Sequence, residues 1–161
     1  MSCLGVHFAL TADEVAQLRA LDGDDARLDY VQGTIEEGYF SMDDKSLHAE
    51  SDKAWDAMHR ALASSGAPLD RAILGGELLY DGDDYVMSLK TPDEVRAIAA
   101  ALAGLTDDDF RARYRAIDEE AYGFPLTDDD CAYTLEWLEN VRALYARAAA
   151  DGRWVLFTVD Q

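Results

Sequence analysis

Four threonines, each followed by acidic residues, constrain the fold of this 161-residue sequence more than any other feature. A threonine before a helix accepts a hydrogen bond from a backbone N–H of the first turn, and an acidic side chain three residues later accepts one from the threonine's backbone N–H. Thr11 and Thr91 have glutamate in that position, whereas Thr106 and Thr127 each precede three aspartates. The sequence therefore predicts helices that begin after these four threonines.

Four other segments carry strand signals. They are apolar, with β-branched and aromatic residues, and the acidic turn Asp81–Asp84 joins one pair. The expected strands are residues 3–10, 77–80, 85–89 and 154–159. Two further helices are expected around Val31 and over residues 52–63, separated by a loop at 38–46.

Strands and helices are interspersed along the chain, which favours an α/β fold. We therefore expect a three-layer α/β/α sandwich in which about six helices cover a small mixed sheet of about four strands. Because the chain contains no internal repeat, linker or low-complexity tract, we expect residues 1–161 to form a single domain. Its first and last strands should bring the termini together.

The chain is strongly acidic: 33 Asp and Glu residues against 14 Lys and Arg residues give a net charge of −19. This charge does not suit nucleic acid or anionic lipid, both of which are bound by Lys and Arg. Ten acidic residues fall in the first turns of expected helices, where they meet the positive end of the helix dipole. They are Asp13, Glu14, Asp93, Glu94, Asp107, Asp108, Asp109, Asp128, Asp129 and Asp130. The other 23 still outnumber the basic residues, which fits either a solubilising surface or one that attracts a basic protein.

The sequence also bears on compartment. The N-terminus does not resemble a secretory signal, and no apolar run approaches the ~18 residues that a membrane span needs. The cysteines, Cys3 and Cys131, suit small buried side chains in a reducing compartment. We therefore expect a cytoplasmic monomer with neither a membrane nor a nucleic-acid partner.

Standard catalytic and cofactor motifs are absent from the sequence. There is no dinucleotide fingerprint, phosphate loop or nucleophile elbow, so no cofactor is expected. His48 and Glu50 match half of a zinc-deaminase motif, but the Pro-Cys-x-x-Cys half is missing. The aspartates that follow Asp81 do not continue as a calcium loop. We therefore expect no bound metal.

One group of side chains is a candidate site. Asp52, Trp55, Asp56 and His59 are spaced by three or four residues, which places them on one side of the expected helix. Asp56 would orient the His59 imidazole as a general base, so these two are weak candidates for catalysis, and Trp55 and Asp52 for binding. The same spacing also suits simple packing of the imidazole, or a binding surface without catalysis.

Several segments resemble the YfbM-like proteins, a bacterial family described as a domain of unknown function. The resemblance spans nearly the whole chain, and its most specific part is the pattern Lys53-x-Trp55-Asp56-x-x-His59. The other similar segments are Met1–Thr11, Arg71–Gly76, Tyr85 and Leu89–Val95. The sequence departs at Tyr122-Gly123, where the family has Tyr-Pro. The resemblance implies a three-layer α/β/α fold and supplies no catalytic residues.

The leading functional interpretation is an acidic binding protein of the bacterial cytosol. In its concrete form it is an immunity-type inhibitor that blocks a basic protein partner, such as a toxin. Asp83 and Asp84 are the side chains that we expect to contact this partner.

The alternative is a small-molecule-binding protein or an enzyme. Its pocket would lie around Trp55, Asp56 and His59 and reach Glu77 and Tyr85. A third interpretation is a scaffold that self-associates through an exposed helix face.

Overall fold

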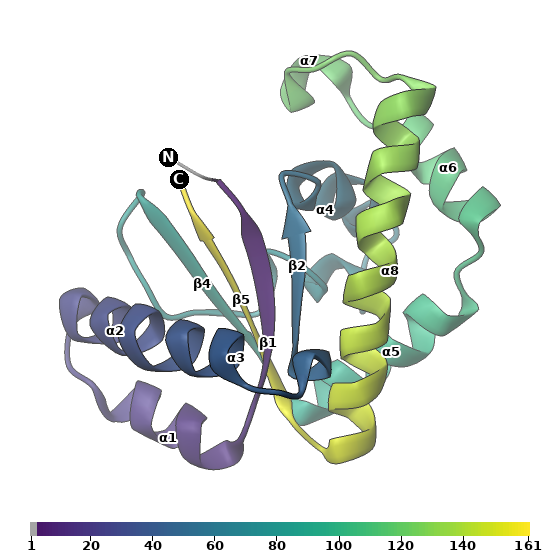
Figure 1. The fold of residues 1–161 in the computed structure, drawn as a ribbon. Coiled ribbons are helices and arrows are strands. Elements are labelled where there is room, and N and C mark those ends of the chain that lie inside the picture. Colours follow the sequence, from purple (N-terminus) through teal and green to yellow (C-terminus); the bar gives the residue numbers. More distant parts are fainter. Residues whose placement is uncertain (1–2) are drawn as a thin grey trace.

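The computed structural model describes residues 3–161, which form a central sheet with helices on both faces (Figure 1). The sheet has five strands in the order β2-β1-β5-β4-β3, and every neighbouring pair is antiparallel. The strands are β1 (Gly5–Leu10), β2 (His48–Asp52), β3 (Glu77–Leu78), β4 (Tyr85–Lys90) and β5 (Trp154–Asp160). Because β1 and β5 are adjacent, the two ends of the described chain lie close together (Figure 1).

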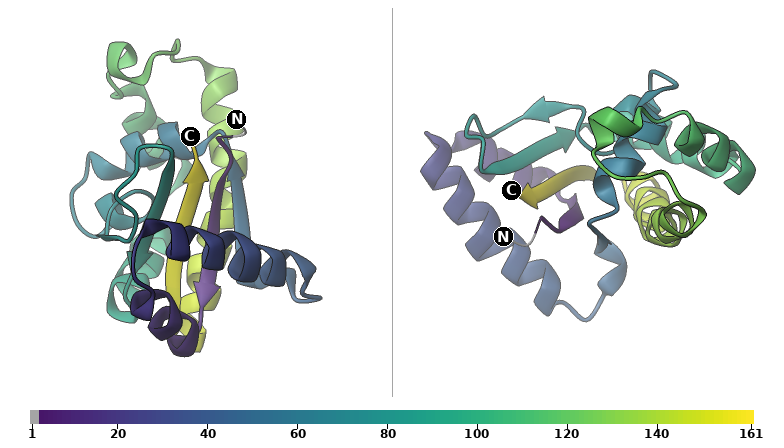
Figure 2. Two further views of the ribbon diagram at one scale, coloured as in Figure 1. Left: turned by 90° about the vertical axis from the view of Figure 1, so that its left-hand side faces the viewer. Right: turned by 90° about the horizontal axis from the view of Figure 1, so that it is seen from above.

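Helices cover the two faces of the sheet as separate layers (Figure 2). One layer contains α1 (Ala12–Ala20), α2 (Asp24–Tyr30), the π-helix η1 (Val31–Glu36) and α3 (Glu37–Ser41). The other contains α4 (Trp55–Ala63), α5 (Pro92–Gly104), α6 (Asp107–Arg115) and α8 (Asp128–Asp151). Shorter elements are α7 (Glu119–Tyr122) and the 3-10 helices η2 (Lys45–Leu47) and η3 (Leu69–Arg71). The predicted three-layer α/β/α architecture is therefore confirmed.

The four helix starts predicted from threonine are also confirmed. Thr11, Thr91 and Thr106 each accept a hydrogen bond from the third backbone N–H of their helix, and the acidic side chain of that third residue accepts one from the threonine's own backbone N–H. Thr127 accepts a hydrogen bond from the backbone N–H of Asp130. Each of these helix ends also carries the acidic residues that favour the positive end of its dipole.

Side chains of β1 alternate between the two helical layers, so the whole strand is buried. Phe8 packs edge-on against Tyr39 and Phe40 of α3. His7, on the opposite face, packs edge-on against Tyr145 of α8. Residues in register with Phe8 on neighbouring strands therefore face α3, whereas those in register with His7 face α8.

The sheet differs in two respects from the prediction. It has five strands rather than about four, and it is antiparallel rather than mixed. The helices after β1 and after β4 bring the chain back to the same end of the sheet from which the strand left. The next strand in each case therefore runs antiparallel to it. The unpredicted strand, β2, has the sequence His-Ala-Glu-Ser-Asp, which lacks β-branched and large apolar residues. It is an edge strand in which Ala49 and Ser51 are buried while Glu50 is exposed.

Two helix boundaries also differ. α4 begins at Trp55, three residues later than predicted, because Asp52 is the last residue of β2. α3 continues through Ser41, into the segment predicted as a loop. The burial of Val31 and Ile35 agrees with the helical spacing there, although the turn that carries them is π-helical.

Polar groups in the core fix the loop that follows η3. Lys90 Nζ donates a hydrogen bond to the carbonyl of Ile73 at 2.5 Å, and Tyr145 Oη donates to the carbonyl of Ala72 at 2.6 Å. His7 Nε2 lies 2.9 Å from the same Ala72 carbonyl, and burial lowers the pKa of His7 to about 3. The imidazole is therefore neutral, with its Nε2–H available to donate. These three bonds fix the loop that carries Leu74, which lines a cavity beside α4.

Candidate functional site

α4 places Asp56 and His59 at the wall of a cavity of about 510 Å³. Leu74, from the loop after η3, and Ile117 and Asp118, from the segment between α6 and α7, form other parts of its lining. The structure therefore brings Asp56 and His59 to one cavity. We call it the His59 cavity.

Asp56 does not orient His59 in this cavity. Its Oδ1 atom accepts a hydrogen bond from Arg60 Nε at 2.8 Å, in an ion pair between successive turns of α4. The Nδ1 atom of His59 is buried and has no hydrogen-bond partner in the described part of the chain. Burial lowers the pKa of His59, and the charge of Asp56 opposes that shift. The imidazole is therefore neutral at neutral pH, but the expected Asp56–His59 pair is not formed.

Trp55 and Asp52 serve other contacts. Trp55 Nε1 donates a hydrogen bond to the carbonyl of Cys3 at 2.9 Å, and its ring packs against Phe157. Asp52 Oδ2 accepts a hydrogen bond from Tyr133 Oη at 2.7 Å. The two residues thus tie the β2–α4 junction to the segment before β1, to β5 and to α8, and they do not line the His59 cavity.

Glu77 and Tyr85 do not extend the His59 cavity either. Glu77 lies on the edge strand β3 and pairs with Arg19 of α1 at 2.8 Å. Tyr85 is in register with Asp160, on the face of the sheet that α3 covers. The sheet therefore separates Tyr85 from His59, and the expected single pocket is not present.

Tyr85 instead contributes to a cleft of about 240 Å³ between the sheet and the helical segment α2–η1–α3. The helical wall consists of Gln32, Glu36 and Phe40, which recur every four residues. Val6 of β1 and Tyr85 of β4 contribute from the sheet. We call this the η1 cleft. π-Helical turns such as η1 are rare and are found frequently at functional sites.

The charged side chains that line the η1 cleft are carboxylates. Glu36 is joined there by Glu50 from β2 and Asp160 from the end of β5. Tyr85 Oη donates a hydrogen bond to Glu36 Oε1 at 2.8 Å. Burial raises the pKa of Glu36, as does the charge of Asp160, whereas hydrogen bonds from Tyr85 and Thr158 lower it. Among the described residues, no Lys or Arg lines this cleft.

Two acidic turns, far apart in the sequence, meet beside the start of β4. The backbone N–H of Asp81 donates a hydrogen bond to Asp24 Oδ2 at 3.1 Å. Asp25 follows in the first turn, and Asp83 and Asp84 follow in the second. We call these five residues the acidic-turn patch. In the described part of the chain, none of the five forms an ion pair with Lys, Arg or His.

Hydrogen bonds connect Asp84 of the acidic-turn patch to Tyr80 and to the end of β5. Tyr80 Oη donates to Asp84 Oδ1 at 2.9 Å, and that bond raises the pKa of Tyr80 together with burial and the charges of the acidic turns. The carbonyl of Asp84 accepts a hydrogen bond from the backbone N–H of Gln161 at 2.9 Å. Asp84 therefore lies next to the end of β5, where Asp160 lines the η1 cleft.

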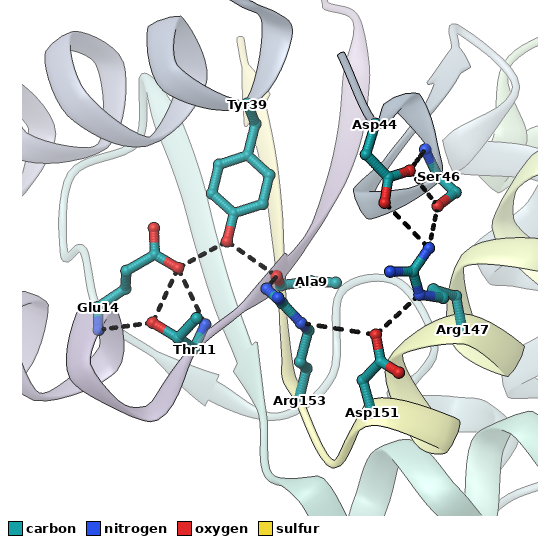
Figure 3. Close-up of polar contacts among 9 residues, drawn as sticks. All are labelled: Ala9, Thr11, Glu14, Tyr39, Asp44, Ser46, Arg147, Asp151 and Arg153. Carbon is teal, nitrogen blue, oxygen red and sulfur yellow. Dashed lines mark hydrogen bonds and ion pairs between the residues drawn. The ribbon is translucent and has the colours of Figure 1, made fainter. Parts of the chain in front are cut away.

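Carboxylates are paired in a different region, where α1, α3, η2 and the end of α8 meet (Figure 3). Glu14 Oε1 accepts a hydrogen bond from Tyr39 Oη at 2.6 Å as well as two from the N-cap residue of α1. Arg147 pairs with Asp44 at 3.1 Å and with Asp151 at 2.7 Å. We call Glu14, Asp44 and Asp151 the paired acids.

Neither a metal centre nor a membrane span was found in residues 3–161. No three His, Cys, Asp or Glu side chains there are arranged to hold a metal ion. No helix in the same range is both long enough and apolar enough to cross a bilayer.

Tyr85 is the one residue of the η1 cleft lining, among the described residues, that belongs to the sequence-based site; the carboxylates Glu36, Glu50 and Asp160 do not. The four-residue spacing of Gln32, Glu36 and Phe40 was an available signal for the helical wall. Glu50 had no such signal, because β2 itself was not predicted.

The fold and these sites define a class of protein: an acidic α/β domain with a five-stranded antiparallel sheet between two helical layers. The chain belongs to the family described as a domain of unknown function, DUF1877, which matches residues 1–158. This confirms the resemblance to YfbM-like proteins.

A solved structure supports the same assignment. The crystal structure of YfbM from Escherichia coli, a protein of unknown function, has a TM-score of 0.63 to this chain. The similarity covers 97% of this chain and 99% of that chain at 20% sequence identity, so it shows the fold alone. No protein with a curated description matches the chain.

Proposed function

We propose that this protein binds a basic protein partner through the acidic-turn patch, as an immunity-type inhibitor that covers the active site of a toxin would. The observation that carries the proposal is the contact between Asp81 and Asp24, which brings two acidic turns together. Within residues 3–161, no basic side chain forms an ion pair with either turn's patch residues. We place this interaction in the bacterial cytoplasm, with a monomeric chain and no cofactor.

Physical reasoning favours a partner over a purely solubilising role for the patch. Carboxylates held close together repel one another, and a basic surface relieves that repulsion when it binds. Complementary charge also accelerates the encounter between two proteins, an effect that salt screens. A solubilising surface would work equally well with its charges dispersed, whereas the patch concentrates five carboxylates on two adjoining turns.

Capture and inhibition together test the proposal. The tagged protein is used to capture partners from its native host, with stepwise elution by salt and identification by mass spectrometry. We expect one basic protein, recovered in stoichiometric amount, whose own activity is inhibited when the purified protein is added back. An added-back partner that keeps its full activity would remove the inhibitor role.

Association kinetics then test the surface. The triple variant Asp25→Asn/Asp83→Asn/Asp84→Asn should lower the association rate by about tenfold or more at low salt, with a smaller loss at high salt. The matched control removes the same number of charges elsewhere, from Asp107, Asp128 and Asp129. Equal rates for the two variants would show that only net charge matters, and would remove the patch as the binding surface.

A second candidate function is small-molecule binding in the His59 cavity. The observation in its favour is a neutral imidazole, with a lowered pKa, at the wall of a cavity of about 510 Å³. Neutral imidazole is the form that acts as a general base. Under this proposal, His59→Ala abolishes the thermal stabilisation by a ligand found in a screen, while the Tm of the free protein changes little. A large loss of Tm without ligand would instead indicate packing.

A further inference from the structure

The η1 cleft combines an apolar wall with an acidic rim. Phe40 and Leu4 both line it, and they remain 38% and 43% exposed although most large apolar side chains of the described chain are buried. Val6 adds an aliphatic surface from β1. An apolar surface that stays accessible inside a cleft suits a ligand with an aliphatic or aromatic part.

The acidic rim is assembled from three separate elements of the fold. Glu36 comes from η1, Glu50 from β2 and Asp160 from β5, so the three carboxylates face the cleft from different sides. No Lys or Arg within residues 3–161 lines the cleft to neutralise them. Charge complementarity therefore selects a cation, and the apolar wall selects a cation carried on a hydrocarbon stem.

Glu36 is the best placed of the three to bind such a cation directly. Tyr85 donates a hydrogen bond to its Oε1 atom and Thr158 donates another to the same carboxylate. Because a carboxylate has about four lone-pair sites, it keeps acceptor capacity for an incoming N–H group. Tyr85 is itself 4% exposed and packs edge-on against Tyr80, whose hydroxyl holds Asp84 of the acidic-turn patch. The cleft and the patch are therefore linked by two aromatic side chains in contact.

We infer that the η1 cleft receives an arginine side chain of the basic partner, with the guanidinium among Glu36, Glu50 and Asp160 and the aliphatic stem against Phe40 and Leu4. This inference deepens the proposed function and rests on it. Arginine fits better than lysine because its planar, multi-donor head can bond carboxylates from several directions and stack on an aromatic ring.

A short peptide tests the cleft without the partner. The probe is acetyl-Gly-Arg-Gly-amide, and the matched control peptide carries citrulline, which has nearly the same shape as arginine but no charge. Binding is followed by NMR chemical shifts at millimolar peptide. We expect shifts at residues of the η1 cleft with the arginine peptide, and affinity at least about tenfold weaker with the citrulline peptide.

Two variants locate the contact. Glu36→Gln keeps the shape and removes the charge, and it should weaken the arginine peptide by about tenfold. Glu37→Gln is the control: it changes the next residue in the chain, which is exposed and does not line the cleft, and it should leave the affinity unchanged. If Glu36→Gln perturbs the fold, as judged by circular dichroism, Glu50→Gln replaces it. Absence of shifts in the cleft, or equal binding of the two peptides, would overturn the inference.

The outcomes separate this inference from the proposed function. If the peptide fails to bind but the triple variant of the acidic-turn patch still slows association with the partner, the cleft inference is wrong and the function stands. If the peptide binds in the cleft but no patch variant changes partner association, the cleft recognises arginine and the surface assigned to the partner is wrong.

Discussion

The paired acids and the acidic-turn patch show two uses of the same side-chain chemistry. Glu14 has a tyrosine partner and Asp44 an arginine partner from distant parts of the chain, so these contacts join α1 to α3 and the start of η2 to α8 (Figure 3). Asp151 pairs with the same Arg147 within α8. Asp81 contacts Asp24 through a hydrogen bond from its backbone N–H to the Asp24 carboxylate. No basic side chain in the described range forms an ion pair with either carboxylate. The first arrangement suits stability, whereas the second leaves charge available for a partner.

The largest effect that this comparison predicts is at Glu14. Replacement by alanine removes the carboxylate half of the capping box of α1, although the Thr11 hydroxyl can still accept from the backbone N–H at position 14. It also leaves the hydroxyl of Tyr39 with the Ala9 carbonyl but without its carboxylate partner. We expect Glu14→Ala to lower the free energy of unfolding by about 2 kcal/mol, because the loss of half of the capping box and of the bond to Tyr39 act together.

Urea denaturation with an unchanged m-value measures this loss. Asp13→Ala is the control, since Asp13 lies exposed in the same first turn. If both variants lose the same stability, Glu14 acts only through the helix dipole. Its contact with Tyr39 would then add no stability, and the proposed difference between paired and unpaired acids would not hold for Glu14.

The sequence predicted those features of the fold that local chemistry decides. Threonine caps marked four helix starts, and apolar strands marked the sheet, because caps and burial act within a few residues. β2 was missed because its edge position requires only alternate small buried residues, Ala49 and Ser51. Because β2 was missed, the predicted start of α4 was three residues too early, and Asp52 was assigned to the helix although it ends β2.

The candidate sites were less predictable for the same reason. Asp56 and His59 share a cavity because both lie on α4, but Tyr85 faces the other side of the sheet. That separation depends on strand order and register, which a single sequence does not encode locally. The contact between the turns of Asp24 and Asp81 likewise arises only when the whole chain folds.

Arg147 provides the next test of the paired acids. It contacts Asp44 and Asp151 while its side chain is 39% exposed, so solvent weakens both ion pairs. We expect Arg147→Ala to lower the free energy of unfolding by a small but measurable amount, since one guanidinium serves two carboxylates. Arg115→Ala, an exposed arginine without an ion pair in the described chain, should cost less. Equal losses, measured by urea denaturation, would show that the pairs add nothing.

Removal of the Glu36 charge should stabilise the protein rather than destabilise it, and the size of the effect should depend on pH. Its pKa is raised in the folded state, so folding favours the protonated carboxyl. That contribution is present below the ordinary value of 4.5 and is lost as the pH rises through the folded-state pKa. Glu36→Gln should therefore raise Tm slightly at neutral pH and leave it unchanged below pH 4.5. Glu37→Gln is the control. A variant that weakens arginine binding while raising Tm marks a residue kept for binding rather than stability.

The smallest expected effect is at the acidic-turn patch itself. Asp83→Asn should raise the free energy of unfolding by only about 0.3 kcal/mol at low salt, because it removes repulsion from Asp81 and Asp84 and breaks no ion pair. Salt screens that repulsion, so the gain should disappear when wild type and variant are compared at about 1 M salt, where the Debye length is about 3 Å. Thermal melts at the two salt concentrations measure the difference. A loss of stability at low salt would mean that the Asp83 carboxylate has a stabilising role, and the patch would then belong with the paired acids.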